Sequence, residues 1–209
     1  PMIQSPSCKV IVEVKQKYIK NISSIMKAAA IENNSSVDPV ELVNILGVVQ
    51  SLPKTISSKK KYKGFSTKDI RVGDTAIFSY RVIYDFIQVG EDIKYKNLIK
   101  YEDKELFTAD ITDVFGVIRD GKIIMINGYV MTTPFAEKKI ILAAASKQTK
   151  GTVISEVIEI GNPKETDKPL EVKQGDSIYY NPMKAQKYQI NNKPFVIIPQ
   201  SQVLGKIVA

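Results

Sequence analysis

Short runs of hydrophobic residues, many of them β-branched, alternate along the chain with clusters of Gly, Pro, Asn and Asp. Runs of this length, bounded by turn residues, are typical of β-strands. The pattern therefore predicts an all-β protein built as barrels or sandwiches. The predicted strands cover residues 10–14, 75–83, 122–132, 153–160, 177–180 and 195–198.

Two stretches near the N-terminus carry helix signals. Hydrophobic residues recur at helical spacing over residues 18–31. A short helix is also indicated at Asp38, because Asp is a good N-cap, Pro39 suits the first helical position and Glu41 suits the third. The apolar residues that follow suit a strand equally well, so both interpretations stay open there.

The sequence repeats one pattern twice. Residues 70–78 parallel residues 172–180, with a Gly-Asp pair at the same place in each. Residues 107–118 parallel residues 195–207 with one residue inserted. An internal repeat of this kind predicts two copies of one β module. The Asp120-Gly121 dipeptide favours a turn, so the predicted domains are residues 1–120 and 121–209.

Composition excludes several classes of function. The 209 residues contain no His and a single Cys, Cys8. Catalytic triads and imidazole metal ligands need His, and a disulfide or a Cys-rich zinc site needs more thiols. We therefore predict no enzymatic activity, no catalytic residue, no metal site and no cofactor. No apolar run approaches the roughly 18 residues that span a bilayer, so a cytoplasmic protein is expected.

Positive charge is concentrated in one segment, residues 54–71, which we call the basic loop. The chain carries 30 Lys and Arg against 22 Asp and Glu, for a formal charge of +8. A solvated loop explains such a run, and Lys in place of Arg favours that interpretation, because the planar fork of Arg suits phosphate better. The alternative is a nucleic-acid-binding or virion-structural β-barrel protein. In it, Tyr62 and Phe65 would stack on bases beside the candidate basic residues Lys59, Lys60, Lys61, Lys63 and Lys68.

The second copy resembles the co-chaperonin (GroES) family. The segments that carry the resemblance are EVIEIGN at 156–162, KPLEVKQGD at 168–176, KPFVII at 193–198 and QVLGKI at 202–207. The first copy is more divergent but keeps a similar first strand and the Val72-Gly73-Asp74 turn. The whole chain thus resembles two co-chaperonin modules fused head to tail. The resemblance implies two tandem GroES-like β-barrel modules with long mobile loops.

One segment, KIILAAASK at 139–147, resembles the mobile loop of that family. The resemblance implies that Ile140, Ile141 and Leu142 dock on a chaperonin. Three adjacent aliphatic residues also suit a buried strand, although the polar runs on both sides favour a solvated loop.

The corresponding segment of the first copy holds Ile25 and Met26, which form a second candidate docking loop. Lys27 stands where the family pattern expects a third apolar residue. Ile25 and Met26 also fit the apolar face of the predicted helix, so both interpretations apply to them.

The resemblance implies a co-chaperonin that caps a chaperonin ring through mobile apolar loops and assists ATP-dependent protein folding. The expected partners are a GroEL-like ring in its nucleotide-bound state, an unfolded client protein and further copies of the chain in a homo-oligomeric ring. Membranes are not expected as partners, and nucleic acid is disfavoured. A phage protein in the host cytoplasm is favoured over a plastid protein. Because bacterial chaperonin rings are sevenfold and whole chains supply an even number of modules, either the symmetry is mismatched or one module serves another purpose.

Overall fold

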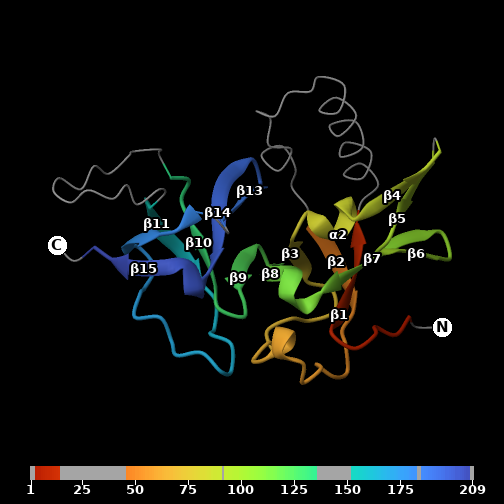
Figure 1. The fold of residues 1–209 in the computed structure, drawn as a ribbon, viewed down its shortest axis with the longest axis horizontal. Helices are drawn as coiled ribbons and strands as arrows, with labels where there is room; N and C mark the ends of the chain where they lie inside the picture. The colour runs from red at the N-terminus through yellow and green to blue at the C-terminus, as the bar shows by residue number, and fades with distance from the viewer. Residues whose placement is uncertain (1–2, 15–45, 91, 136–151, 183–184, 208–209) are drawn as a thin grey trace.

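The structure is a computed structural model that describes residues 3–14, 46–90, 92–135, 152–182 and 185–207. These residues form an all-β protein, which confirms the predicted fold class. Two large sheets lie side by side, and a two-stranded hairpin projects from the first sheet (Figure 1). The helical segments are short, namely α2 (Arg81–Tyr84), η2 (Lys60–Tyr62), η3 (Ile111–Asp113) and η5 (Gln200–Gln202). No helix in the described part of the chain is long and apolar enough to span a bilayer.

Every neighbouring pair of strands is antiparallel, so the sheets need no crossover helices. The first sheet has the order β6-β7-β1-β2-β3-β8-β9 and the second β13-β14-β10-β11-β12-β15, while β4 and β5 form the hairpin. The strands of the first sheet are β1 (Lys9–Val14), β2 (Leu46–Ser51), β3 (Thr75–Phe78), β6 (Leu98–Tyr101), β7 (Lys104–Asp110), β8 (Val114–Arg119) and β9 (Lys122–Met125). The strands of the second are β10 (Tyr129–Thr132), β11 (Val153–Ile160), β12 (Ser177–Tyr180), β13 (Gln186–Ile190), β14 (Lys193–Pro199) and β15 (Val203–Lys206), and the hairpin joins β4 (Phe86–Val89) to β5 (Asp92–Tyr95).

Without β9, the first sheet has the same strand order as the second. The strands β1, β2, β3, β6, β7 and β8 each have a counterpart at the same place in the second sheet, and η3 is equivalent to η5. The β4–β5 hairpin and η2 have no counterpart among the described residues. The irregularities repeat as well, because the ladder shifts between Ile77 and Phe78 in one sheet and between Tyr179 and Tyr180 in the other. The two halves of the chain, residues 3–119 and 120–207, therefore share one architecture.

The two Gly-Asp turns that revealed the repeat have the same geometry. Gly73 and Gly175 both have positive φ, 93° and 87°, which favours glycine at this point of the turn. In each turn the Asp side chain accepts a hydrogen bond from a backbone N–H three residues earlier, Arg71 at 2.7 Å for Asp74 and Lys173 at 3.0 Å for Asp176. The repeated Gly-Asp signal in the sequence thus corresponds to two equivalent turns.

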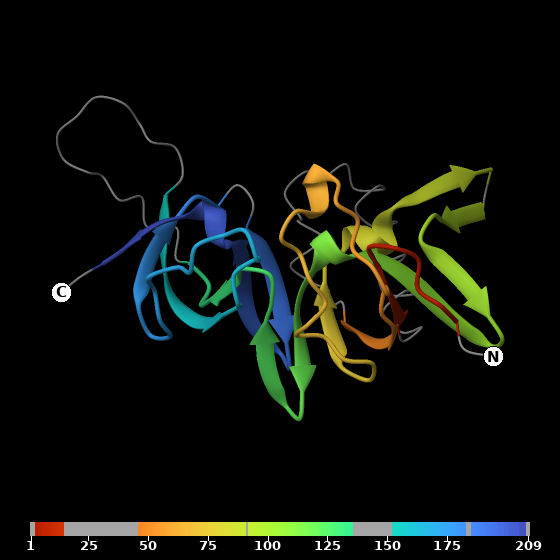
Figure 2. The ribbon, with the colours of Figure 1, turned by 90° about the horizontal axis from the view of Figure 1, so that it is seen from below.

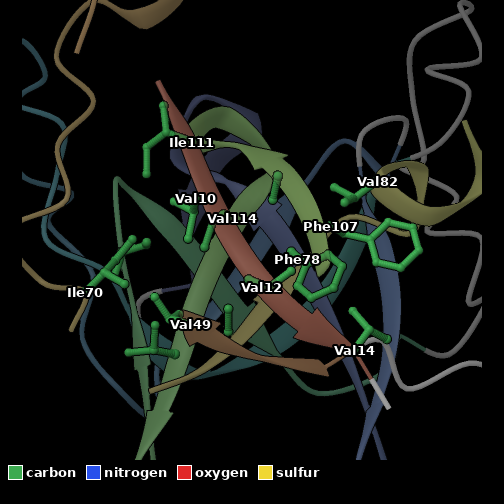
Figure 3. Packing of buried hydrophobic residues seen from close by; sticks show 14 of the residues in the cluster. Val10, Val12, Val14, Val49, Ile70, Phe78, Val82, Phe107, Ile111 and Val114 are labelled. Atoms are coloured by element: carbon green, nitrogen blue, oxygen red, sulfur yellow. The ribbon is translucent and has the colours of Figure 1, made fainter. Parts of the chain in front are cut away.

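Each half has its own hydrophobic core, and a third cluster lies between the sheets. In the first half, alternate residues of β1 point inward, so that Val10, Val12 and Val14 meet Phe78 and Phe107 (Figure 3). This alternation follows from the two-residue period of a strand. The N-terminal pattern of hydrophobic residues therefore positions β1 at the centre of the first sheet.

Two predicted strands differ from the structure. The strand predicted over residues 75–83 ends at Phe78, because Ser79 accepts a hydrogen bond from the Arg81 N–H and the chain turns into α2. The strand predicted over residues 122–132 is divided into β9 and β10 by a turn in which Asn127 and Gly128 have positive φ. Apolar residues continue through both turns, so hydrophobicity alone did not mark them.

The sequence alignment of the two copies needs one correction. The pairing of β1 with β7 and of β10 with β14 makes Phe107 the counterpart of Val196, and no residue is inserted between there and the end of each repeat. Leu106 is the counterpart of Phe195, so the two Phe residues are one position out of step. The helices predicted at 18–31 and at Asp38 lie outside the described residues.

We predict that the two equivalent turn carboxylates contribute unequally to stability. Arg119 donates to both carboxylate oxygens of Asp74, at 2.8 and 2.6 Å, whereas Asp176 has a longer ion pair, 3.7 Å, with Lys206. Asp74→Ala should lower the free energy of unfolding by about 1.5 to 3 kcal/mol, because it removes the buried acceptor of three hydrogen bonds, and Asp176→Ala by about 1 kcal/mol. Urea denaturation followed by circular dichroism measures both, and equal losses would contradict the assignment.

Candidate functional site

The two halves are joined by a continuous β-hairpin. β8, the last strand of the first half, pairs with β9 through a turn at Asp120 and Gly121, which both have positive φ. Gly116 lies opposite Met125 in this ladder. A Cβ atom at Gly116 would lie 2.8 Å from the Ile124 carbonyl oxygen, so glycine permits the close approach. Figure 2 shows this green hairpin between the two sheets.

Apolar residues from both sheets pack around this hairpin and form what we call the seam. Its buried members are Ile77, Phe115, Met125, Met131, Tyr188, Ile190 and Ile197. The Phe115 ring meets the rings of Tyr129 and Tyr188 edge to face, with centroids 4.7 and 6.0 Å apart. The seam is therefore packed as a protein core and fixes one half of the chain against the other.

Two tyrosine hydroxyls from the second half form hydrogen bonds to the first half at the seam. The Tyr129 hydroxyl donates to the Thr112 carbonyl at 2.9 Å, and the Tyr188 hydroxyl donates to the Phe78 carbonyl. Burial raises the pKa of both hydroxyls well above that of an exposed tyrosine, so both remain protonated donors at neutral pH. These hydrogen bonds cross from one half to the other.

In the second half, the residues equivalent to three seam residues of the first half are exposed. Strand pairing makes Tyr179, Leu204 and Ile207 equivalent to Ile77, Phe115 and Ile118. Leu204 is 59% exposed and Ile207 47%, whereas Phe115 is only 3% exposed. We call Tyr179, Leu204 and Ile207 the exposed apolar patch. The patch spans β12, which holds Tyr179, and β15, which is an edge strand of the described sheet and is followed by Ile207.

The N-terminus carries a segment equivalent to β9. Cys8 and Gly128 both have positive φ, and the carbonyl of each accepts a hydrogen bond from the first residue of the equivalent 3-10 turn, at 2.9 and 2.8 Å. Counting back from these two turns makes residues 3–5 the sequence counterparts of residues 123–125 of β9. Unlike β9, residues 3–5 pair with no strand in the described chain.

The predicted basic loop is anchored to the first core by a buried carboxylate. Asp110 accepts hydrogen bonds from Lys61 Nζ at 2.8 Å and from the Tyr62 hydroxyl at 2.9 Å, and Thr112 donates to its other oxygen. Burial alone would raise the pKa of Asp110, but the hydrogen bonds from Lys61, Thr112 and Tyr62 outweigh it and lower the pKa to about 2. Sequence reasoning missed Asp110, because its partners lie far away along the chain.

The basic loop also contacts the second half. Ser66 exchanges two hydrogen bonds with the Asn127 side chain, at 3.0 and 3.1 Å, and the Gly64 carbonyl accepts from the Glu165 N–H at 3.0 Å. The ammonium group of Lys164 lies 5.2 Å from the centre of the Phe65 ring. The loop is therefore held by residues within η2 and by residues directly after it.

The candidate residues of the basic loop separate into two groups. Lys59, Lys60, Lys63 and Lys68 are exposed, whereas the charge of Lys61 is paired with Asp110. Tyr62 and Phe65 are half-buried and pack against the first core, so they are not presented for base stacking. The candidate docking residues Ile140, Ile141, Leu142, Ile25 and Met26 lie outside the described residues.

Residues 122–207 match a family model described as the chaperonin 10 Kd subunit. No curated protein matches the chain. The matched segment begins at β9 and contains the whole second sheet, including the exposed apolar patch. It supports a co-chaperonin role in general and a chaperonin of the GroEL type as partner. The described residues hold no group of three or more side chains suited to a metal ion.

We predict that the Asp110 anchor weakens in acid. Because the folded-state pKa is lowered from 3.8 to about 2, the ionised carboxylate stabilises the fold above about pH 4, and this contribution is lost as the pH falls toward 2. Asp110→Asn should lower the free energy of unfolding by about 2 kcal/mol at pH 7. The difference in the free energy of unfolding between this variant and the unsubstituted chain should decrease below pH ~4 and vanish near pH ~2.

Urea denaturation at a series of pH values measures this difference. Asp103→Asn is the matched control, since Asp103 is exposed and has no ion pair among the described residues. A loss for Asp110→Asn that is the same at every pH would contradict the prediction.

Proposed function

We propose that this chain is a double co-chaperonin, with two modules fused head to tail, that caps a chaperonin ring in its nucleotide-bound state. The observation that carries the proposal is the family match over residues 122–207. The equal strand order of the two sheets supports the extension to the first half. The nucleotide belongs to the chaperonin in this proposal, and the chain acts by binding and release.

The docking residues are proposed to lie in the two segments that connect equivalent strands. Ile140, Ile141 and Leu142 lie between β10 and β11 in the chain, and Ile25 and Met26 lie between β1 and β2. Fully burying one aliphatic side chain contributes about 1.5 to 3 kcal/mol, while ordering each loop residue costs about 1 to 2 kcal/mol. One loop therefore binds weakly. Several loops on one assembly bind tightly through effective concentration and still release.

The seam between β8 and β9 supports a specific way of assembling further chains. Applying its register to β15 places Gly205 opposite Ser5 of the next copy and Ile207 opposite Ile3. This contact would pair the exposed edge of β15 and cover the exposed apolar patch. Burying the exposed parts of Leu204 and Ile207 would contribute roughly 2 to 3 kcal/mol. The proposed product is a head-to-tail homo-oligomer that closes into a ring.

The chamber under such a ring is proposed to hold an unfolded client protein. The family resemblance implies that the segment before the Gly-Asp turn forms the roof of the chamber. Here that segment of the first half is the basic loop, which is longer than its counterpart at residues 161–174. The two segments contact one another through Gly64 and Glu165, so they would line the roof together.

Replacing the docking residues should abolish chaperonin binding. Ile140→Ser, Ile141→Ser and Leu142→Ser in one variant remove the apolar side chains that the groove would bury. We expect this variant to lose co-elution with an ATP-loaded GroEL-type ring on size-exclusion chromatography. The matched control replaces three apolar residues elsewhere, Val72, Ile87 and Val89, which are all exposed. Undiminished co-elution of the loop variant would sink the assignment of the loop.

Charging the exposed apolar patch should prevent assembly. Leu204→Lys with Ile207→Lys places two like charges where the next chain would pack. We expect the native mass to fall from an oligomer to a single chain of 23.3 kDa. The control, Val72→Lys with Ile87→Lys, makes the same change at two exposed positions outside the patch. Light scattering measures both, and an unsubstituted chain that is already monomeric would refute this interface.

A further inference from the structure

Five lysines of the basic loop are in no ion pair with a described residue. Of its seven basic side chains, only Lys61 is in an ion pair among the described residues. The two nearest carboxylates along the chain are occupied elsewhere, because Asp69 accepts from Asn162 and Asp74 from Arg119. The charge of Arg71 helps to lower the pKa of Asp74, which leaves the five lysines Lys54, Lys59, Lys60, Lys63 and Lys68 unpaired among the described residues. This loop therefore keeps most of its charge available to a partner.

Three of these lysines are held in one short turn. The Tyr62 N–H donates to the Lys59 carbonyl at 2.8 Å, and the Lys63 N–H donates to the Lys60 carbonyl at 3.3 Å. Residues three apart eclipse one another in a 3-10 turn, so Lys60 and Lys63 leave the backbone on the same side. Lys61 and Tyr62 are directed to Asp110 instead. Lys59 precedes the turn as its N-cap residue and is exposed like Lys60 and Lys63, so these three side chains stay exposed while Lys61 and Tyr62 anchor the turn.

The other repeat shows that the fold does not need this charge. Residues 161–174 occupy the equivalent place in the second half and hold Lys164, Lys168 and Lys173 against three carboxylates. Lys164 is itself paired with Asp167 at 3.1 Å. The two halves therefore build the same turn and sheet, with a large excess of positive charge in the first half and none in the second. The excess of lysine is a property of the first half alone.

We propose that Lys59, Lys60 and Lys63 form a docking surface for an acidic polypeptide segment. Three ammonium groups on a turn that is fixed by Asp110 and by Ser66–Asn127 meet such a segment with little loss of backbone entropy. A polypeptide is favoured over nucleic acid on two grounds. The neighbouring aromatic side chains, Tyr62 and Phe65, are packed against the core, and the surface lacks the planar forks of arginine that suit phosphate. This binding does not depend on the chaperonin.

The experiment measures binding of a fluorescently labelled oligoglutamate peptide to the full chain by anisotropy at low salt. The test variant combines Lys59→Gln, Lys60→Gln and Lys63→Gln. The control combines Lys94→Gln, Lys100→Gln and Lys193→Gln, which removes the same charge from exposed lysines of other strands. Exposed ion pairs contribute about 0.2 to 1 kcal/mol each, so we expect the test variant to bind about 3- to 100-fold more weakly. The control should change affinity by less than about 2-fold.

Three results would overturn the proposal. If the unsubstituted chain does not bind oligoglutamate at low salt, the proposed docking surface does not exist. Equal weakening by the test and control variants shows that net charge, not this turn, attracts the peptide. Tighter binding of a single-stranded or duplex oligonucleotide, lost in the same test variant, assigns the surface to nucleic acid. Circular dichroism and urea denaturation of each variant confirm that it is folded, so that each result is decisive.

Discussion

The close packing of Phe115 against Tyr129 and Tyr188 holds the two halves of the chain in one arrangement. This packing adjoins the ladder between β8 and β9 and the hydrogen bond from the Tyr188 hydroxyl to the Phe78 carbonyl. Burying a polar hydroxyl is tolerated because that hydrogen bond satisfies it. The seam is therefore a continuation of the two cores, and the basic loop, which bonds to Asn127 beyond β9, depends on it as well.

Local features of the sequence predicted most of the fold. The all-β class followed from the short hydrophobic runs. The repeat followed from the Gly-Asp pairs, because a turn with positive φ favours glycine and this glycine can be recognised in the sequence. Long-range partners were not predictable. Asp110 gave no signal of its role, since its partner Lys61 is distant in the chain and one lysine among several has nothing to distinguish it. The ends of the strands at Phe78 and at Met125 were missed, because buried residues continue beyond both.

The candidate site divides in the same way. The basic loop was visible as a run of charge, but the difference between the paired Lys61 and its exposed neighbours needed the structure. The exposed apolar patch had no signal at all in the sequence. Leu204 and Phe115 are both apolar residues before a glycine in a strand. Phe115 is buried beside β9, whereas Leu204 has no such neighbouring strand among the described residues and is exposed. Comparing equivalent positions of the two halves was what revealed it.

The turn between β8 and β9 contains only Asp120 and Gly121, so the two halves have little freedom to move relative to one another at this connection. The angle between successive sheets is thereby set within a single chain, before any second copy arrives. If each contact in the proposed oligomer repeats the same geometry, that one hairpin determines the curvature of the proposed ring and hence its diameter. Lengthening the turn by a few flexible residues would leave each sheet intact and loosen the closure of the whole.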